Sequence, residues 1–437
     1  MQKIQFSDME LSNEMQRAVE EMGFEEPTSI QAASIPMILS GRDVIGHSQT
    51  GTGKTAAFSI PAIEKINPAG GRKTQVLILC PTRELAVQAC DEIRKFAKYK
   101  PFLKVVPIYG GQPIERQFTA LRGGAQIVVG TPGRVMDHMR RGTLKLDTLH
   151  MIILDEADEM LSMGFREDIE TILKDVPQER QTILFSATMS PEIMRITKQY
   201  QTDPELIRIT REQLTVPNIE QTYYEVPVGK KTEVLSRLLD VYNPSRSIVF
   251  CNTKKQVDEL VEELHARGYQ ARGLHGDMKQ GERTQIMNGF RRGSIDILVA
   301  TDVAARGIDV EDIAAVFNYD IPQDVEYYVH RIGRTGRIGK EGRAFTFVTG
   351  RRQIYELRDI ERFTKSKITL KAVPSSSEVN ETNERKFLDR VRVVLEEGGL
   401  EEYTPYTDAL LEDYASLDIS AALIKMLLKK ELSLIHI

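Results

Sequence analysis

Short apolar runs recur along the chain, and stretches long enough to form helices separate them. The first four runs are Val76–Cys80, Gln126–Gly130, Met151–Leu154 and Thr182–Phe185. Because nearly every position in these runs is apolar, they predict strands that are buried on both faces, as in parallel sheets. Amphipathic stretches such as Arg83–Tyr99 and Glu167–Val176 predict the crossover helices that parallel strands require.

The same alternation restarts after residue 220. The later runs are Ser247–Phe250, Ile295–Ala300, Ala315–Asn318 and Ala344–Val348. A chain of 437 residues is too long for one core. We therefore expect an α/β fold with two tandem parallel-sheet domains, 1–210 and 219–368, joined by a linker at 211–218. The stretch around this linker, Thr210–Asn218, is polar and contains Pro217 near its end.

The C-terminal segment has a different character. A polar, serine-containing break at Pro374–Asn383 precedes a stretch with helical periodicity, which predicts a small helical domain over 383–430. Its apolar stripes are Phe387, Val391, Val394 and Leu395, then Leu423, Met426 and Leu427. These stripes need a partner, which is a second copy, the chain's own core or another protein. From residue 370 onward there are 8 Lys/Arg and 13 Asp/Glu, so this acidic segment is a poor RNA binder by itself.

Composition excludes several classes of protein. The net charge of −5 argues against a passive nucleic-acid coat. The three cysteines, Cys80, Cys90 and Cys251, form no C-x-x-C pair, so we expect neither a disulfide framework nor a zinc site, and a cytoplasmic location fits. The N-terminus lacks an apolar signal region, and no apolar run approaches the ~18 residues of a membrane span, so no membrane association is expected.

A candidate phosphate-binding loop follows the strand-like residues Asp43–Ile45 and precedes an apolar helical stretch. Glycines let backbone N–H groups approach phosphates, and the helix N-terminus adds its positive dipole end. Lys54 is expected to reach the β- and γ-phosphates, and the Thr55 hydroxyl to ligand Mg²⁺. The first position of the usual pattern is Ser48 instead of glycine, and a flexible surface loop is the alternative. The expected nucleotide-binding residues here are Ser48, Gln49, Thr50, Gly51, Thr52, Gly53, Lys54 and Thr55.

Two carboxylates follow the predicted strand Met151–Leu154. Ligands of open parallel sheets bind at the carboxyl ends of the strands. Asp155 is expected to hold Mg²⁺ through water, and Glu156 to orient or deprotonate the attacking water. An acidic strand end is often only solvated surface, but together with a phosphate loop about a hundred residues upstream it predicts nucleotide hydrolysis.

These two segments resemble motifs I and II of the DEAD-box RNA helicases, and the resemblance extends over roughly residues 6–350. It implies two RecA-like domains. Upstream, Phe6, Gly23–Phe24, Pro27–Thr28 and Ile30–Gln31 resemble the family's Q motif, which selects adenine. The Gln31 amide offers a donor and an acceptor that match the adenine edge. By this match Thr28 and Phe24 also belong to the ATP site, although Phe24 is either a stacking partner or core.

Further motifs resemble those that face RNA in the family's first domain. Hydroxyls, backbone amides and arginines at these positions are able to grip phosphates without reading bases. The residues are Pro81, Thr82, Arg83, Gly110, Gly111, Thr131, Pro132, Gly133 and Arg134. Ser186 and Thr188 resemble motif III, which in the family links the ATP site to RNA; a simple helix cap is the alternative.

The second predicted domain carries the remaining motifs of the resemblance. Asn252, Thr253, Arg283, Thr301 and Asp302 match positions that lie near RNA. Gly307 and Asp309 match positions near the nucleotide, with Asp309 near its ribose. His330 matches a residue that positions water, and Arg334 and Arg337 match arginine fingers. A solvated arginine-rich face is the alternative.

The resemblance implies an ATP- and Mg²⁺-dependent RNA helicase that remodels or locally unwinds duplexes without sequence specificity. Two alternatives remain: an ATP-dependent RNA clamp or scaffold, and a DNA helicase or remodeller, against which Gln31 and Asp155–Asp158 speak. The C-terminal segment resembles that of the bacterial cold-shock type of these helicases, CshA and DeaD, which implies a homodimer. Cold-shock or stress response, RNA decay and ribosome biogenesis are the expected settings, with proteins of RNA decay or ribosome assembly as partners.

Overall fold

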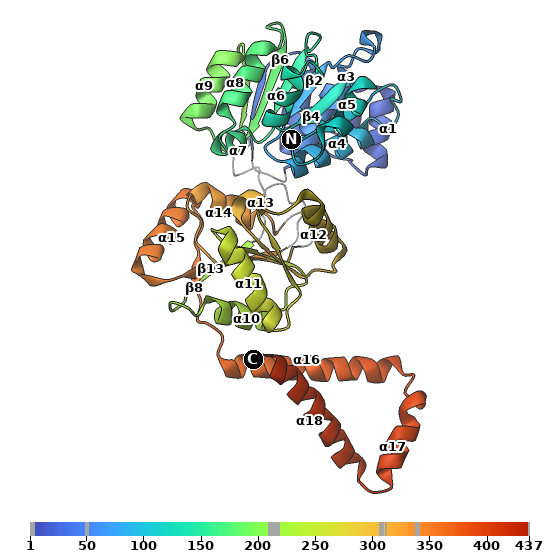
Figure 1. The fold of residues 1–437 in the computed structure, drawn as a ribbon, viewed down its shortest axis with the longest axis vertical. Helices are drawn as coiled ribbons and strands as arrows, with labels where there is room; N and C mark the ends of the chain where they lie inside the picture. The colour runs from blue at the N-terminus through green and yellow to red at the C-terminus, as the bar shows by residue number, and fades with distance from the viewer. Residues whose placement is uncertain are drawn as a thin grey trace. The chain divides into compact units, whose positions relative to one another are not determined.

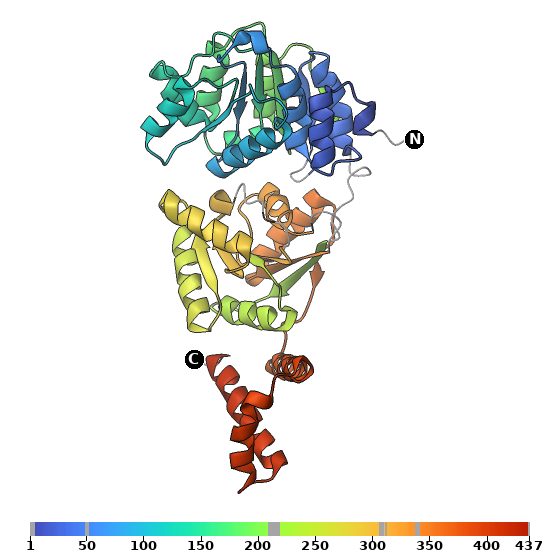
Figure 2. The same ribbon diagram turned by 90° about the vertical axis from the view of Figure 1, so that its right-hand side faces the viewer.

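The computed structural model describes residues 5–48, 52–208, 219–305, 310, 313–336 and 341–435, with the side chains of 326 and 428–435 excepted. The described residues form two compact units, 5–208 (unit 1) and 219–435 (unit 2). Figure 1 and the rotated view in Figure 2 show each unit as a twisted sheet with helices on both faces. The predicted linker at 211–218 lies outside the described residues.

The sheet of unit 1 contains seven parallel strands. In spatial order they are β3 (Val105–Ile108), β4 (Ile127–Gly130), β2 (Val76–Leu79), β5 (Met151–Leu154), β6 (Gln181–Ser186), β1 (Val44–His47) and β7 (Glu205–Arg208). The helices are α1 (Asn13–Glu21), α2 (Ser29–Leu39), α3 (Lys54–Glu64), α4 (Arg83–Phe96), α5 (Ile114–Arg122), α6 (Pro132–Arg140), α7 (Ala157–Ser162), α8 (Arg166–Asp175) and α9 (Pro191–Tyr200), with 3₁₀ turns at Phe6–Asp8 and Pro68–Gly70.

The strands of unit 1 are apolar throughout because each face of the sheet has its own core. In β2, Val76 and Ile78 pack into one core, whereas Leu77 and Leu79 pack into the other. Side chains of α2, α3 and α4 complete the first core, and those of α6, α8 and α9 complete the second. Continuous apolar runs are therefore the pattern that a sheet covered on both faces requires.

Unit 2 repeats the architecture with a second seven-stranded parallel sheet. In spatial order its strands are β10 (Ala271–Leu274), β11 (Ile297–Ala300), β9 (Ser247–Phe250), β12 (Ala315–Asn318), β13 (Gly342–Val348), β8 (Ile219–Glu225) and β14 (Thr369–Leu370). The helices are α10 (Lys231–Tyr242), α11 (Lys254–Ala266), α12 (Gln280–Arg292), α13 (Asp302–Ala305), α14 (Val325–Ile332) and α15 (Gly350–Thr364).

The two parallel sheets confirm the predicted α/β class. Each of the eight predicted runs corresponds to a strand whose ends differ by at most two residues, as β11 does by starting at Ile297 instead of Ile295. The edge strands β3, β7, β10 and β14 and the strand β8 were not predicted. They carry polar residues or, in β3, a proline, so their sequences do not show the fully buried pattern.

The predicted polar break at Pro374–Asn383 is wrong over residues 376–383, which are helical. The C-terminal elements are α16 (Ser376–Glu397), a 3₁₀ turn (Glu401–Tyr403), α17 (Thr404–Leu411) and α18 (Ser416–Ile435). The serines mark a helix start: Ser375 Oγ accepts from Glu378 N–H, and the Glu378 carboxylate accepts from Ser375 N–H. This is a capping box, which satisfies two otherwise unpaired N–H groups of the first turn.

Only the first half of α16 packs against unit 2. Val379 and Phe387 are buried, and Lys386 Nζ donates to the carbonyl oxygen of Asp240 in α10. Arg237 Nη1, also in α10, donates to the carbonyl oxygen of Pro374 over 3.0 Å. Apolar side chains farther along remain exposed, among them Val394, Leu395, Tyr403, Tyr406, Leu410, Leu411, Tyr414, Leu417, Leu423, Met426 and Leu427. Figure 1 shows α16, α17 and α18 as three separate rods.

No helix among the described ranges is both long enough and apolar enough to cross a membrane.

Candidate functional site

The sheet order of unit 1 sorts the predicted site residues into two groups. Ser48, Asp155 and Ser186 stand at the carboxyl ends of β1, β5 and β6, which are neighbours in the sheet. The residues predicted to face RNA follow β2, β3 and β4, which are neighbours in the other half. Loops at the carboxyl edge of a parallel sheet form the usual ligand crevice. The nucleotide-type and RNA-type residues therefore share one edge and occupy different halves of it.

The described part of the phosphate loop is held from both sides. Ser48 N–H donates to the carbonyl oxygen of Ser186, and Lys54 Nζ donates to the carbonyl oxygen of Ser48 over 3.3 Å. Gly53 has φ +86° and precedes the first residue of α3, so the chain enters the helix through a left-handed turn. Lys54 is buried at that helix N-terminus. The predicted residues Gln49, Thr50 and Gly51 lie outside the described residues.

Gln31 lies against the phosphate loop and is only 1% exposed. Its Nε2 donates to the carbonyl oxygen of Gly53 over 3.1 Å, and its Oε1 accepts from Thr28 N–H over 2.9 Å. Thr28 Oγ1 in turn donates to the carbonyl oxygen of Thr52 over 2.8 Å. The two predicted Q-motif residues are thus joined to the loop that is expected to hold phosphates. Both functional groups of the Gln31 amide are used within the protein.

Phe24 packs in an aromatic cluster beside the first core. Its ring lies 6.2 Å from that of Phe6 and 6.0 Å from that of Phe96. The side chain is half-buried, so part of its surface remains open. Core packing is the role that this geometry shows, and stacking on a base stays a prediction.

Asp155 is buried directly after β5, and its Oδ1 atom has no hydrogen-bond partner. Burial raises the pKa of Asp155 to about 7, although the nearby Lys54 ammonium acts in the opposite direction. A buried carboxylate oxygen without a partner is costly unless a cation meets it. Over the described ranges, no cluster of three or more His, Cys, Asp or Glu is placed to hold a metal. A single carboxylate that shares the ion with phosphates is how Mg²⁺ is usually bound, so Asp155 fits that ion.

Glu156 occupies the left-handed backbone region, with φ 50° and ψ 53°. This conformation costs a non-glycine residue about 1–2 kcal/mol. It places Glu156 between the end of β5 and the start of α7. Strain of this kind persists only where neighbouring contacts enforce it, and it is common at functional sites.

Asp158 connects the β5 loop to the β6 loop. Its Oδ2 accepts from Ala187 N–H over 3.0 Å and from Thr188 N–H over 2.8 Å. Ser186 Oγ donates to the carbonyl oxygen of Thr188. The residue that caps the next helix, α9, is Ser190, so Ser186 and Thr188 do not serve as its cap. The segment predicted to resemble motif III is thereby joined to the acidic segment.

The arginine predicted to follow β2 packs on the glycines that follow β3. A Cβ placed on Gly111 would lie 1.8 Å from Arg83 Nη1, and Gly111 has φ +83°. Only glycine satisfies both the backbone angle and the approach of the guanidinium. Pro81, Thr82 and Arg83 are therefore fixed beside Gly110 and Gly111.

The third predicted RNA-facing segment, Thr131–Arg134, begins α6 and also reaches the glycine loop. Arg134 Nη1 and Nη2 donate to the carbonyl oxygen of Gln112 over 3.3 Å and 3.4 Å. Pro132 is the first residue of α6, where its missing N–H costs nothing. All three RNA-type segments of unit 1 thus come together at one part of the edge.

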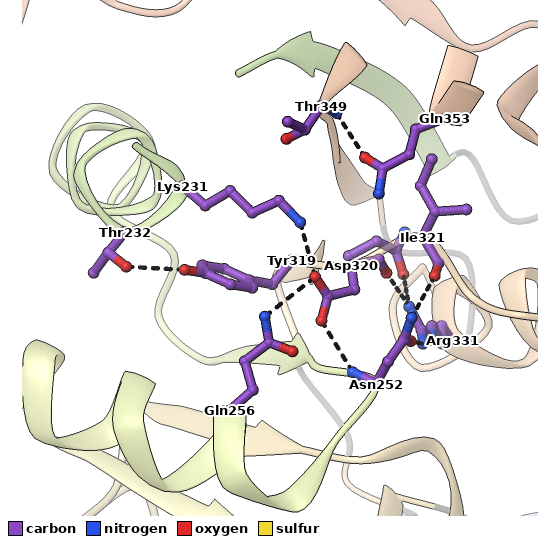
Figure 3. A network of polar contacts seen from close by, with 11 residues as sticks. Lys231, Thr232, Asn252, Gln256, Tyr319, Asp320, Ile321, Arg331, Thr349 and Gln353 are labelled. Atoms are coloured by element: carbon purple, nitrogen blue, oxygen red, sulfur yellow. Dashed lines mark hydrogen bonds and ion pairs between the residues drawn. The ribbon is translucent and has the colours of Figure 1, made fainter. Parts of the chain in front are cut away.

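In unit 2 the predicted motif residues converge on Arg331, which is fully buried in α14 (Figure 3). Its Nε and Nη2 donate to the two carboxylate oxygens of Asp302, and Nη2 also donates to Asn252 Oδ1 over 2.9 Å. Nη1 donates to Asn318 Oδ1 and to the carbonyl oxygen of Asp320. Each of the five N–H groups of a guanidinium therefore has an acceptor. The loops that follow β11, β9 and β12 are held together by one side chain.

Asp320 extends this network on the side of α10, as Figure 3 shows. Its Oδ1 accepts from Lys231 Nζ over 2.8 Å and from Gln256 Nε2 over 3.3 Å. Its Oδ2 accepts from Asn252 N–H over 3.1 Å. Arg331 and Lys231 are thereby paired with the carboxylates of Asp302 and Asp320, which offsets the cost of removing these charges from water.

The remaining predicted residues of unit 2 lie around this network. Thr253 Oγ1 caps α11 by accepting from Gln256 N–H, just as Thr82 Oγ1 caps α4 in unit 1 by accepting from Leu85 N–H. Arg283 donates to the carbonyl oxygens of His275 and Ala304. Thr301 is half-buried between β11 and α13.

The described part of the arginine segment is compact. Arg334 is mostly buried, and its Nε donates to the carbonyl oxygen of His330 over 3.1 Å. The predicted residues Gly307, Asp309 and Arg337 lie outside the described residues.

Two important residues were absent from the sequence-based set of site residues. Asp158 was expected only as part of an acidic segment, and Arg331 only as part of an arginine-rich one. The signal for Asp158 was a carboxylate two residues after Glu156, in the first turn of α7. Its role as an acceptor depends on the loop after β6, which lies beside it only in the folded sheet. For Arg331 no local signal distinguished a buried arginine from its exposed neighbours.

Three family models match successive parts of the chain. The DEAD/DEAH box helicase model matches residues 28–196, and the helicase conserved C-terminal domain matches residues 230–339. The RNA helicase DeaD dimerization domain matches residues 374–436. The last match includes the residues from 376 to 383 that form the start of α16.

Relatives and solved structures agree with these matches. DEAD-box ATP-dependent RNA helicase CshA of Geobacillus kaustophilus (strain HTA426) is 51% identical over 97% of this chain and 90% of its own length. The CshA of Bacillus subtilis (strain 168) is 49% identical over 98% of this chain and 86% of its own length. S. cerevisiae Dbp5 bound to RNA and ADP BeF3 has a TM-score of 0.78 and 31% identity, covering 87% of this chain and 99% of that chain. The chain therefore belongs to the family of DEAD-box ATP-dependent RNA helicases.

Proposed function

We propose that the chain binds ATP with Mg²⁺ at the β1–β6–β5 half of the unit 1 edge and couples its hydrolysis to remodelling or local unwinding of RNA duplexes. The observation that carries this proposal is the bridge from Asp158 to Ala187 and Thr188. It joins the acidic segment after β5 to the loop after β6, which is the segment that resembles motif III. In the family that motif links the ATP site to RNA.

The nucleotide roles follow from the local geometry. The N-terminus of α3 offers backbone N–H groups and a positive dipole end to the phosphates, and Lys54 adds a cation there. Thr55 and Asp155 would hold Mg²⁺, which neutralises charge on the phosphate oxygens. Glu156, which directly follows the metal-binding carboxylate, orients the attacking water and accepts its proton. Gln31 selects adenine from its position against the phosphate loop.

RNA is held by groups that contact the sugar–phosphate backbone. Arg83 and Arg134 supply cations, Gly110 and Gly111 supply N–H groups, and Thr301 supplies a hydroxyl. Contacts of this kind carry no base information, so binding is independent of sequence. Contacts to 2′-hydroxyls make the protein prefer RNA to DNA.

Unit 2 is expected to supply residues that act on the nucleotide. Arg334 and Arg337 act as arginine fingers, a role that is worth about 10³–10⁵ in rate. His330 helps to position water, and Gly307 and Asp309 contact the nucleotide. If both units contribute to binding of ATP and of RNA, each ligand favours the binding of the other. The similarity to S. cerevisiae Dbp5, whose solved structure is bound to RNA and ADP BeF3, supports the binding of both kinds of ligand.

The experiment that tests the proposal combines two assays on the full chain. ATPase activity is measured with RNA and with DNA of the same sequence, and a short RNA duplex is offered with ATP or with a non-hydrolysable analogue. We expect stimulation by RNA alone and strand release that needs ATP. Stimulation by DNA would favour a DNA remodeller, and tight RNA binding without strand release would favour a clamp.

The C-terminal helices are the proposed dimer interface. The exposed apolar side chains of α17 and α18 need a partner, and the segment matches the DeaD dimerization domain. We expect two copies to pair through them. A cytoplasmic setting is proposed on the basis of three free, buried cysteines, whose thiol pKa values burial raises. Cold-shock response, RNA decay and ribosome assembly remain the predicted settings, with proteins of those processes as predicted partners.

A further inference from the structure

Helix α5 is attached to unit 1 by a buried amide in addition to half-buried apolar side chains such as Leu121. Among its nine residues the one fully buried side chain is that of Gln117, which is 3% exposed. Surface helices normally bury an apolar stripe, because apolar contacts stabilise packing without demanding partners. A buried amide stabilises a helix only when every polar atom is paired, and then it fixes one geometry.

Gln117 holds the loop that follows β3. Its Nε2 donates to the carbonyl oxygen of Tyr109 over 2.8 Å. Tyr109 directly precedes Gly110 and Gly111, the glycines on which Arg83 packs. The amide therefore fixes the start of the loop that carries Gly110 and Gly111.

The other end of the same amide holds α6. Because Nε2 donates to a carbonyl, Oε1 faces the opposite way and acts as an acceptor. Arg134 Nη1 donates to it over 3.4 Å, and His138 Nε2 lies 2.9 Å from it. An amide oxygen only accepts, so His138 carries its proton on Nε2. Arg134, at the start of α6, thus shares its acceptor with a histidine one turn later.

His138 itself is fully buried and held on its second nitrogen. Its Nδ1 lies 2.9 Å from Thr143 Oγ1, and its ring meets the edge of Phe118 with centroids 5.6 Å apart. Burial and the neighbouring Arg134 lower the pKa of His138, which keeps the imidazole neutral. The histidine is therefore a fixed donor whose position is set from three sides.

We propose that Gln117 and His138 are positioning residues that set the spacing between the glycine loop and Arg134, so that both meet successive RNA phosphates. This inference rests on the proposed RNA-binding role of Arg134. Neither residue would touch RNA, because both are buried. Their effect is to remove the need to order two loops on binding, which lowers the cost of association.

Two variants of each residue separate positioning from packing. Gln117→Leu keeps the volume and removes all three hydrogen bonds of the side chain, whereas Gln117→Glu keeps the acceptor and removes the donor to Tyr109. His138→Phe keeps the aromatic contact and removes the donor, whereas His138→Gln retains an N–H at similar reach. We expect the RNA concentration for half-maximal ATPase stimulation to rise about tenfold in Gln117→Leu and His138→Phe. It should return to within about twofold of wild type in His138→Gln.

Gln126 provides a matched control at the opposite end of β4. It is 4% exposed, its Nε2 donates to the carbonyl oxygen of Gly71, and its Oε1 accepts from Lys104 N–H. Gln126→Leu therefore removes an amide that is about as buried and that makes two side-chain hydrogen bonds, one fewer than Gln117. We expect it to lower the melting temperature as Gln117→Leu does, with no change in half-saturation by RNA. The KM for ATP without RNA should stay constant in all variants.

The half-saturating RNA concentrations of Arg134→Ala, Gln117→Leu and Gln126→Leu decide whether Gln117 has a positioning role. If Arg134→Ala raises the half-saturating RNA concentration and Gln117→Leu does not, the positioning role is refuted. An equal rise in Gln126→Leu also refutes it, since general loosening would then explain the effect. If Arg134→Ala itself has no effect, the proposed RNA contact of this loop fails first.

Discussion

Arg331 donates hydrogen bonds to both carboxylate oxygens of Asp302, over 2.5 Å from Nε and 2.7 Å from Nη2. The guanidinium is fully buried and also lies 5.1 Å from the centre of the Phe250 ring. The pair joins the segment after β11 to α14, which follows β12. Asp302 is thus oriented by the protein itself, and its expected approach to RNA stays a prediction.

Replacing only one member of this ion pair should be strongly destabilising. Arg331→Met and Asp302→Asn should each destabilise unit 2 by about 3–5 kcal/mol, because each leaves a buried or half-buried charge without its partner. The double variant should lose less than the sum. Calorimetry of the full chain measures the coupling through the melting of unit 2. Strictly additive losses would show that the two side chains act independently.

Glu156→Gln should reduce ATP turnover by about 10²–10⁴-fold, because the amide cannot accept a proton from water. ATP-dependent RNA binding should persist, since the variant keeps shape and backbone. Steady-state ATPase and RNA binding with and without ATP provide the measurement. Glu179→Gln, an exposed position in the same unit, makes the same charge change and should have no effect. Undiminished turnover in Glu156→Gln would remove Glu156 from its proposed role.

Gly53→Ala should raise the KM for ATP and lower the melting temperature of unit 1. The added Cβ would lie 2.4 Å from Gln31 Nε2, and φ +86° is unfavourable for alanine. Adding Gln31→Ala should relieve the clash and leave the backbone strain of about 1–2 kcal/mol. The partial recovery is read from thermal melting of both variants. A double variant that melts at the same temperature as Gly53→Ala would show that the clash contributes nothing.

Asp158→Asn should lower the amount of duplex separated per ATP hydrolysed. The amide oxygen is a weaker acceptor for the Ala187 and Thr188 N–H groups, so the link between the two loops loosens. Ser190→Ala is the control, because it removes the cap of α9 and costs about 1 kcal/mol. Unwinding and ATPase are assayed side by side. An equal fall in the ratio for Ser190→Ala would assign the effect to stability.

A chain that ends at Gly398 should be monomeric, whereas the full chain should be a dimer. This cut keeps Val379 and Phe387, which pack on unit 2, and removes α17 and α18 with their exposed apolar side chains. Sedimentation of both chains over a range of concentrations is the measurement, and their RNA-stimulated ATPase should match per protomer. A dimeric truncated chain would place the interface elsewhere.

The sequence predicted the strands and the loops after them because burial on both faces leaves a strong apolar pattern. Since parallel strands end at one edge, residues such as Ser48, Asp155 and Thr131 were bound to gather there. The helix start at Ser376 was missed because the serine-rich stretch was interpreted as a polar break. A capping box and a break share the same residues, and only the glutamate at position 378 distinguishes them.

Side-chain partners were harder to predict than strands. The burial of Arg331 depends on the neighbouring order β11–β9–β12, which brings Asp302, Asn252 and Asn318 around one guanidinium. That order is a property of the whole sheet, and no local pattern reports it. The same holds for Gln117, whose partners lie before it in the loop after β3 and after it in α6.

Gln31 uses one N–H and one lone pair of its amide on Gly53 and Thr28, and an amide carries a second of each. A base that meets this second pair would be joined to the phosphate loop through a single side chain. The fit of the base and the position of Gly53 would then depend on the same amide, so a change in one would be felt by the other.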